Sequence, residues 1–132
     1  MTHVSKASAT KKARDEMEKL LTSLMENAGA RTRSKVLTEL LTSTERVMLI
    51  KRLLLISLLK RGVSTHQAAH YLKMSPSTVA RFQEKVRRGH YRHTSQWLRQ
   101  TVVHNHVLHT LEQLAAIPFD VLSKNRGRVQ KD

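Results

Sequence analysis

The chain has 132 residues, 39% of them hydrophobic, and contains no cysteine. This is enough apolar material for one modest core, and it excludes disulfides, thiolate zinc sites and cysteine nucleophiles. Lysine and arginine number 24 against 10 acidic residues, and the resulting net charge of +14 exceeds what solubility requires and indicates a polyanionic partner. Four glycines and two prolines are too few for a turn-rich β protein, so we expect an all-α fold.

Three parts are expected along the chain. Residues 1–10 are small, polar and basic and predict a flexible arm, residues 11–117 predict one all-helical domain of about six helices, and residues 118–132 predict a basic tail. Because the first residues lack the apolar run of a secretion signal, we expect a cytoplasmic protein.

Two helices are expected in the first third of the chain. Apolar side chains recur at spacings of three and four residues, which gives one apolar face of a helix that ends near Asn27 and Gly29. These side chains are Met17, Leu20, Leu21, Leu24 and Met25. Residues 30–35 are expected to form a basic link, and residues 34–41 a short helix.

A long central helix is expected to begin after Thr42. Thr42 and Glu45 stand at capping-box spacing, in which each side chain accepts a hydrogen bond from the other residue's backbone N–H. Apolar residues then cover almost the whole circumference, so this helix should be buried on most sides. It is shorter than a membrane span and is interrupted by Lys51 and Arg52, which argues against a membrane protein. Since a small chain has few other helices to surround it, we expect a homodimer in which a second subunit covers part of it.

Two short helices should follow the central one. Gly62 is suited to end the central helix, and Ser64 begins a second capping-box pattern at the head of a helix of about two turns. Ser75 is a good N-cap, and Pro76 then falls at the first helical position, where its missing N–H has no intrahelical partner anyway. Two short helices joined by about three residues predict a helix-turn-helix over about residues 64–88.

The second of these helices has an apolar side and a polar side at 100° per residue. The apolar side holds Val79, Phe82 and Val86, and the polar side holds Ser77, Arg81, Glu84 and Arg88. A helix about 10–12 Å wide fits a major groove about 12 Å wide, so we expect double-stranded DNA as the partner. Arg81 can form a bidentate pair with guanine, whereas Glu84 either accepts from a cytosine amino group or pairs with a basic residue of the protein. The predicted DNA-contacting residues are Thr65, His66, Ser75, Ser77, Thr78, Arg81, Lys85, Arg87 and Arg88.

The stretch "LLTSTERVMLIKRLLLISLLKRGVSTHQAAHYLKMSPSTVARF" resembles the Trp repressor family, through "TSTER", the internal "KR", "KRG" and "STVAR". It covers about a third of the chain. The resemblance implies an intertwined all-α dimer whose two reading helices enter successive major grooves. The family's turn usually carries a glycine near the position of Lys73, and since a lysine in a left-handed conformation costs about 1–2 kcal/mol, we expect a differently shaped turn here.

The same resemblance implies four corepressor-binding positions, which in this sequence are Thr42, Arg52, Thr78 and Arg81. Two neighbouring positions depart from the tryptophan-sensing pattern: Phe82 stands in place of a glycine and can fill the indole site, and Lys85 stands in place of a serine. We therefore expect a binder that needs no cofactor or that uses another effector, with L-tryptophan as the less favoured alternative.

Beyond the reading helix, Gly89 is expected to act as a stop, and a single last helix is expected over residues 95–116, ended by Pro118. His104, His106 and His109 are spaced too unevenly for one helical face. Surface histidines are therefore preferred over a zinc site.

The sequence thus predicts a sequence-specific, homodimeric transcriptional regulator, with repression as the expected mode. The alternative is a DNA-binding module of a mobile-element transposition or recombination system, which would need a catalytic partner because the chain lacks an acidic catalytic cluster. A histidine-dependent nuclease is disfavoured, since no carboxylate or metal motif accompanies the histidines, and we expect no enzymatic activity.

Overall fold

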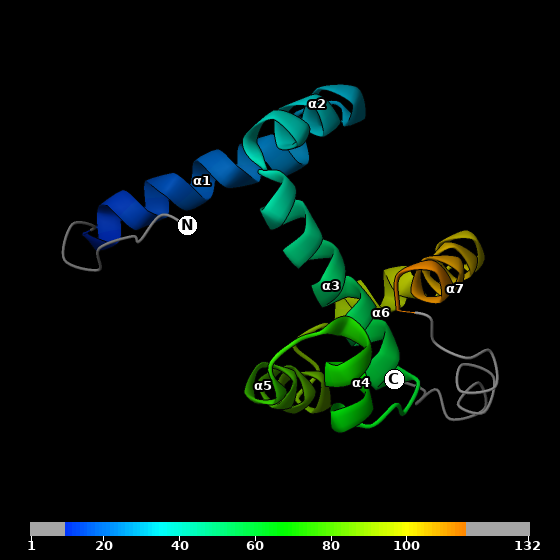
Figure 1. The fold of residues 1–132 in the computed structure, drawn as a ribbon. Helices are drawn as coiled ribbons and strands as arrows, with labels where there is room; N and C mark the ends of the chain where they lie inside the picture. Colours follow the sequence, from blue (N-terminus) through cyan, green and yellow to red (C-terminus); the bar gives the residue numbers. More distant parts are fainter. Residues whose placement is uncertain (1–9, 116–132) are drawn as a thin grey trace. The chain divides into compact units, whose positions relative to one another are not determined.

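The computed structural model describes residues 10–115, and the regular structure in that part of the chain is entirely helical, which confirms the all-α prediction (Figure 1). Seven helices are described, against the predicted six. They are α1 (Lys11–Asn27), α2 (Ala30–Leu40), α3 (Ser43–Lys60), α4 (Thr65–Leu72), α5 (Pro76–Arg87), α6 (Arg92–Leu98) and α7 (Thr101–Ala115). None of the helices between residues 10 and 115 has the length and apolarity needed to cross a membrane. Apart from Thr10, the predicted arm and the predicted tail lie outside the described residues.

The chain divides into two compact units, Met1–Glu45 and Arg46–Asp132, which are described separately. In the first unit α1 ends at Asn27, as predicted, and begins at Thr10, whose hydroxyl accepts a hydrogen bond from the backbone N–H of Ala13 at 3.2 Å.

Helix α2 begins four residues earlier than predicted, so residues 30–35 are helical and are not a link. Gly29 serves as the N-cap, and its carbonyl accepts from the N–H of Arg33 at 2.9 Å. The Arg33 guanidinium also donates to the carbonyl of Ala28 at 2.8 Å, which satisfies an acceptor left over where α1 ends. These contacts come from backbone geometry and a long side chain, and neither leaves a recognisable sequence pattern.

The first unit buries none of its described apolar side chains fully. Most of the predicted apolar face of α1 is exposed, with Leu20 75% exposed, and Leu40 of α2 is exposed as well. The remaining exposed members of the α1 face are Met17, Leu21 and Met25. The described residues of this unit therefore leave an apolar helix face exposed, which is typical of a surface that contacts another part of the chain or a partner.

Helix α3 begins with the predicted capping box. The Thr42 hydroxyl accepts from the N–H of Glu45 at 3.1 Å, and the Glu45 carboxylate accepts from the N–H of Thr42 at 3.2 Å. This backbone hydrogen bond, together with the Thr42 side chain, lowers the pKa of Glu45 below its ordinary 4.5. The prediction of burial on most sides holds only for the C-terminal half of α3, because Val47 to Ile50 are 41–54% exposed.

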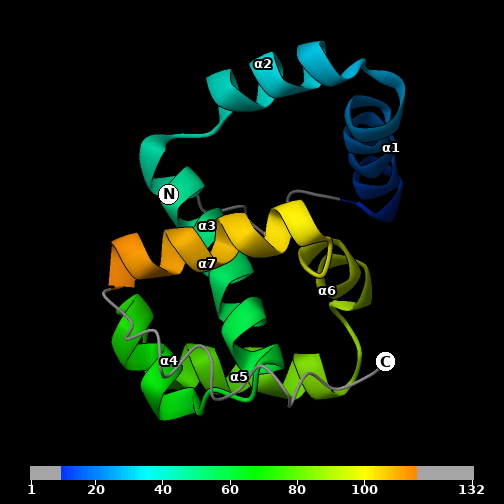
Figure 2. The same ribbon diagram turned by 90° about the vertical axis from the view of Figure 1, so that its right-hand side faces the viewer.

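The core of the second unit forms around the C-terminal half of α3. Leu55 and Leu58 of α3, Val79 of α5 and Leu111 of α7 are completely buried in it, and α4 adds Ala68. Figure 2 shows α4 and α5 at this end of α3, and α7 passing across α3 farther from that end. The rest of the buried apolar cluster is Leu54, Leu59, Val63, Ala69 and Leu72.

Local caps define α4 and α5 as the sequence predicts. The hydroxyl of Ser64 accepts from the N–H of Gln67 at 3.1 Å, that of Ser75 accepts from the N–H of Thr78 at 3.2 Å, and Pro76 opens α5. The expectation of an altered turn between them is wrong, because Lys73 adopts the left-handed conformation itself, with φ 52° and ψ 52°. Its N–H and that of the next residue return to carbonyls of α4, which closes the helix end despite the cost of the lysine Cβ.

The single helix predicted over residues 95–116 is wrong, because the structure has two helices, α6 and α7, separated at Arg99 and Gln100. Leu98 is buried, and a continuous helix would turn Val102, four residues later, toward the same side. Val102 is instead 82% exposed. The break changes which side of the helix faces the core, so that Leu111 of α7 is buried there. Gly89 ends α5 with φ 75°, as predicted, and Pro118 lies outside the described residues.

Candidate nucleic-acid interface

Helix α5 is anchored on one side and open on the other. Val79 is completely buried, and Phe82 and Val86 pack partly buried against the same core. These are the three residues that the helical spacing assigns to the apolar side. The opposite side is exposed and carries Ser77, Arg81, Glu84 and Arg88, and Lys85 and Arg87 are exposed on the flanks between the two sides.

The N-terminal turn of α5 gathers three hydroxyl groups and a guanidinium. The Ser75 hydroxyl lies 2.9 Å from that of Ser77 and 3.1 Å from that of Thr78, while also capping the helix. Arg81 donates to the Thr78 hydroxyl at 3.4 Å. The structure therefore brings together four of the predicted DNA-contacting residues at one end of the helix, and it holds Arg81 toward that end.

The C-terminal half of α5 contains an ion-pair cluster. Glu84 accepts from the guanidinium of Arg88 at 3.1 Å and lies 3.8 Å from that of Arg87. Of the two expected roles for Glu84, pairing with a basic residue of the protein is the one observed. Lys85 is exposed beside this cluster.

Thr65 and His66, the two remaining predicted contacts, are exposed in the first turn of α4. They belong to a different helix from the others, and no described hydrogen bond joins either side chain to α5.

The charge of this unit is very uneven. Between residues 46 and 111 the sequence has twelve lysines and arginines but one acidic residue, Glu84. The twelve are Arg46, Lys51, Arg52, Lys60, Arg61, Lys73, Arg81, Lys85, Arg87, Arg88, Arg92 and Arg99. Such an excess creates a positive potential that attracts polyanions.

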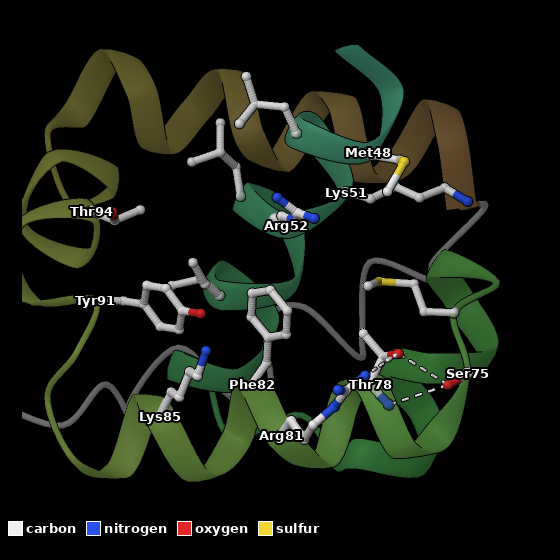
Figure 3. Close-up of a pocket in the computed structure, with 14 residues that line it drawn as sticks. Met48, Lys51, Arg52, Ser75, Thr78, Arg81, Phe82, Lys85, Tyr91 and Thr94 are labelled. Atoms are coloured by element: carbon white, nitrogen blue, oxygen red, sulfur yellow. Dashed lines mark hydrogen bonds between the residues drawn. The ribbon is translucent and has the colours of Figure 1, made fainter. Parts of the chain in front are cut away.

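A cavity of about 730 Å³ lies between α3, α5 and α6 (Figure 3). It brings together three of the four predicted corepressor residues, Arg52, Thr78 and Arg81. The fourth, Thr42, is not among the lining residues, and its hydroxyl is engaged in the capping box. Phe82 lines the cavity, as Figure 3 shows, and its ring stacks on that of Tyr91 at 5.4 Å and 9°.

The chemistry of this cavity is cationic. Lys51, Arg52, Arg81 and Lys85 line it, and no acidic residue between positions 10 and 115 does. A free amino acid would bring an ammonium group, for which the described lining residues offer hydroxyl oxygens but no opposite charge. Lys51 and Tyr91 were not predicted as site residues, because only packing between three helices brings them to the cavity.

The histidines of α7 do not form one cluster. The Nδ1 atom of His104 lies 3.0 Å from the guanidinium of Arg61, which is buried and also donates to the hydroxyl of Ser57 at 3.4 Å. His106 and His109 are exposed. Within residues 10–115, no group of three or more histidine or acidic side chains is placed to hold a metal ion.

Comparison with protein-family models, with curated proteins and with solved structures found no match to this chain.

Proposed function

We propose that this protein is a sequence-specific DNA-binding transcriptional regulator that acts as a homodimer, with α4 and α5 as a helix-turn-helix and α5 as the reading helix. The observation that carries the proposal is the two-sided character of α5. Its apolar side is fixed to the core through Val79, while the opposite side is exposed, polar and cationic. A helix held in this way can enter a major groove without unfolding or repacking.

Contacts with DNA would be divided along α5. The hydroxyls near its N-terminus and Arg81 are suited to base edges, and a bidentate contact of Arg81 with guanine would contribute about 1–3 kcal/mol of discrimination. Lys85, Arg87 and Arg88 are suited to phosphates, which position the helix without reading sequence. The bond from Arg81 to Thr78 supports this division, because it limits the orientations that the guanidinium samples before binding.

The proposed homodimer is supported by the uncovered apolar side chains. The N-terminal half of α3 exposes Val47, Met48, Leu49 and Ile50, and α1 exposes an apolar face of its own. Exposed apolar surface of this kind marks an interaction site, and a second copy of the chain offers the same surface in return. We propose that these faces are buried between two subunits.

We further propose that DNA binding does not require tryptophan. The cavity that the resemblance to the Trp repressor family would assign to a corepressor is cationic, and Phe82 lines it. Its described lining residues include no carboxylate that could pair with an ammonium group, which disfavours a zwitterionic amino acid.

Selection of bound duplexes from a random pool, at near-physiological salt and with or without tryptophan, tests the proposal. The expected result is an enriched site with two half-sites about one helical turn apart, and the same site under both conditions. Retention of DNA with no enriched sequence would refute a sequence-specific regulator, and enrichment only with tryptophan would refute the ligand-independent part.

A further inference from the structure

Glu84 is an exception within its surroundings. It is the only acidic residue between residues 46 and 111, and it lies on the exposed side of α5, in the same helical row as Ser77 and Arg81. A surface built only to attract phosphate would contain no carboxylate, because that charge repels DNA at short range.

The geometry shows what this carboxylate does in the free protein. It holds Arg88 at 3.1 Å and Arg87 at 3.8 Å, while its own side chain remains 51% exposed. Exposed pairs of this kind contribute little to stability, so folding does not account for Glu84. What the pairs do change is the charge that the C-terminal end of α5 presents, since one carboxylate offsets part of the two guanidinium charges.

Contact with DNA would disturb this arrangement. Phosphates compete with Glu84 for the two guanidinium groups, and a carboxylate that loses them is left with an uncompensated charge beside a polyanion. A cytosine amino group in the groove can compensate it by donating a hydrogen bond. Where the DNA sequence places no cytosine amino group near Glu84, the repulsion between its carboxylate and the phosphates remains.

We propose that Glu84 is a specificity-determining residue that acts against DNA of arbitrary sequence. It lowers non-specific affinity and so raises the ratio between binding to the preferred site and binding to other DNA, which is selection by repulsion of the wrong partner. This inference rests on the proposed function of α5.

The test compares the native chain with Glu84→Gln, which keeps the size of the side chain and removes its charge. Binding is measured by fluorescence anisotropy on two duplexes, the site enriched from the random pool and a scrambled version, over a series of salt concentrations. For Glu84→Gln, we expect affinity for the scrambled duplex to rise about five- to tenfold at 0.15 M salt, with the slope of log K against log salt steeper by about one. Affinity for the enriched site should rise less or fall, so that the ratio between the two decreases.

The matched control is Glu112→Gln, which removes the exposed carboxylate of α7 and the same amount of charge. It should leave both affinities nearly unchanged. An equal gain in Glu112→Gln would show a general charge effect and overturn the inference, as would unchanged or weaker binding of Glu84→Gln to the scrambled duplex. Failure of the native chain to bind either duplex would instead overturn the proposed function, and the inference with it.

Discussion

Lys73 sits in a conformation that its own Cβ disfavours. Its φ of 52° lies in the left-handed region, where a residue with a Cβ loses about 1–2 kcal/mol relative to the right-handed helix. Lys73→Gly should therefore raise the free energy of unfolding by about 1 kcal/mol, after allowing for the greater freedom of glycine in the unfolded chain. Urea unfolding followed by circular dichroism measures this. Lys73→Ala is the control, since it removes the charge but keeps the Cβ, and an equal gain in both variants would contradict the explanation.

Glu45 makes the start of α3 sensitive to acid. Its pKa is lowered by the capping hydrogen bonds from Thr42, so its stabilising contribution is present at neutral pH and is lost as the pH falls through the folded-state pKa. Cα chemical shifts of the first turn of α3 should therefore lose helical character as the pH falls below about 4.5. Glu45→Gln keeps a capping group that does not titrate, and its shifts should stay constant over the same range. Equal acid dependence in both proteins would rule out this carboxylate as the source.

At the scale of elements, the C-terminal half of α3 is the part around which the second unit folds. Leu58 is completely buried in the core cluster, so Leu58→Ala should lower the free energy of unfolding by about 2–5 kcal/mol. Arg52→Ala, on the exposed part of the same helix, should change it by less than about 0.5 kcal/mol. Urea titrations of the two variants measure the difference, and comparable losses would mean that the core is not where the structure places it.

The helices that begin at a side-chain cap were predictable from sequence, because a cap is a contact over three residues. This applies to the capping box at Thr42 and to Ser75 with Pro76 at the head of α5. The break between α6 and α7 was not predictable, since Leu98 and Val102 fit a continuous helix and only the burial of one and exposure of the other reveal two helices. It depends on how distant elements pack, which local spacing does not contain.

The candidate site likewise has one part that could be predicted from the sequence and one part that could not. The outward side of α5 follows from 3.6-residue spacing, and it includes Arg81 and Arg88. The cavity beside α5 does not follow from helical spacing. Lys51 belongs to α3 and Tyr91 precedes α6, and both meet α5 only in the folded chain. For the same reason, sequence alone left the partner of Glu84 open between the protein and DNA.

At the scale of the whole molecule, the exposed first half of α3 predicts association. If the proposed homodimer forms through this surface, Ile50→Lys, which places a charge on it, should shift the protein to monomer in sedimentation equilibrium. The control Asn105→Lys adds the same charge to an exposed polar position of α7 and should leave the proposed dimer intact. A native chain that is monomeric at all concentrations would contradict the proposed interface, and so would a dimer that Ile50→Lys leaves unchanged.

The scarcity of carboxylates between residues 46 and 111 has a consequence for ionic strength. Twelve cations confined to one small fold repel one another, and mobile ions weaken that repulsion. The melting temperature of the protein alone should therefore climb as sodium chloride is added from about 20 to 300 mM, whereas the proposed binding to DNA should weaken over the same range. Differential scanning calorimetry checks the first trend, and a melting temperature that is flat or falls with salt would contradict it. If the proposed binding to DNA is correct, a duplex should raise the melting temperature most in dilute buffer, where few mobile ions are present to offset these twelve charges.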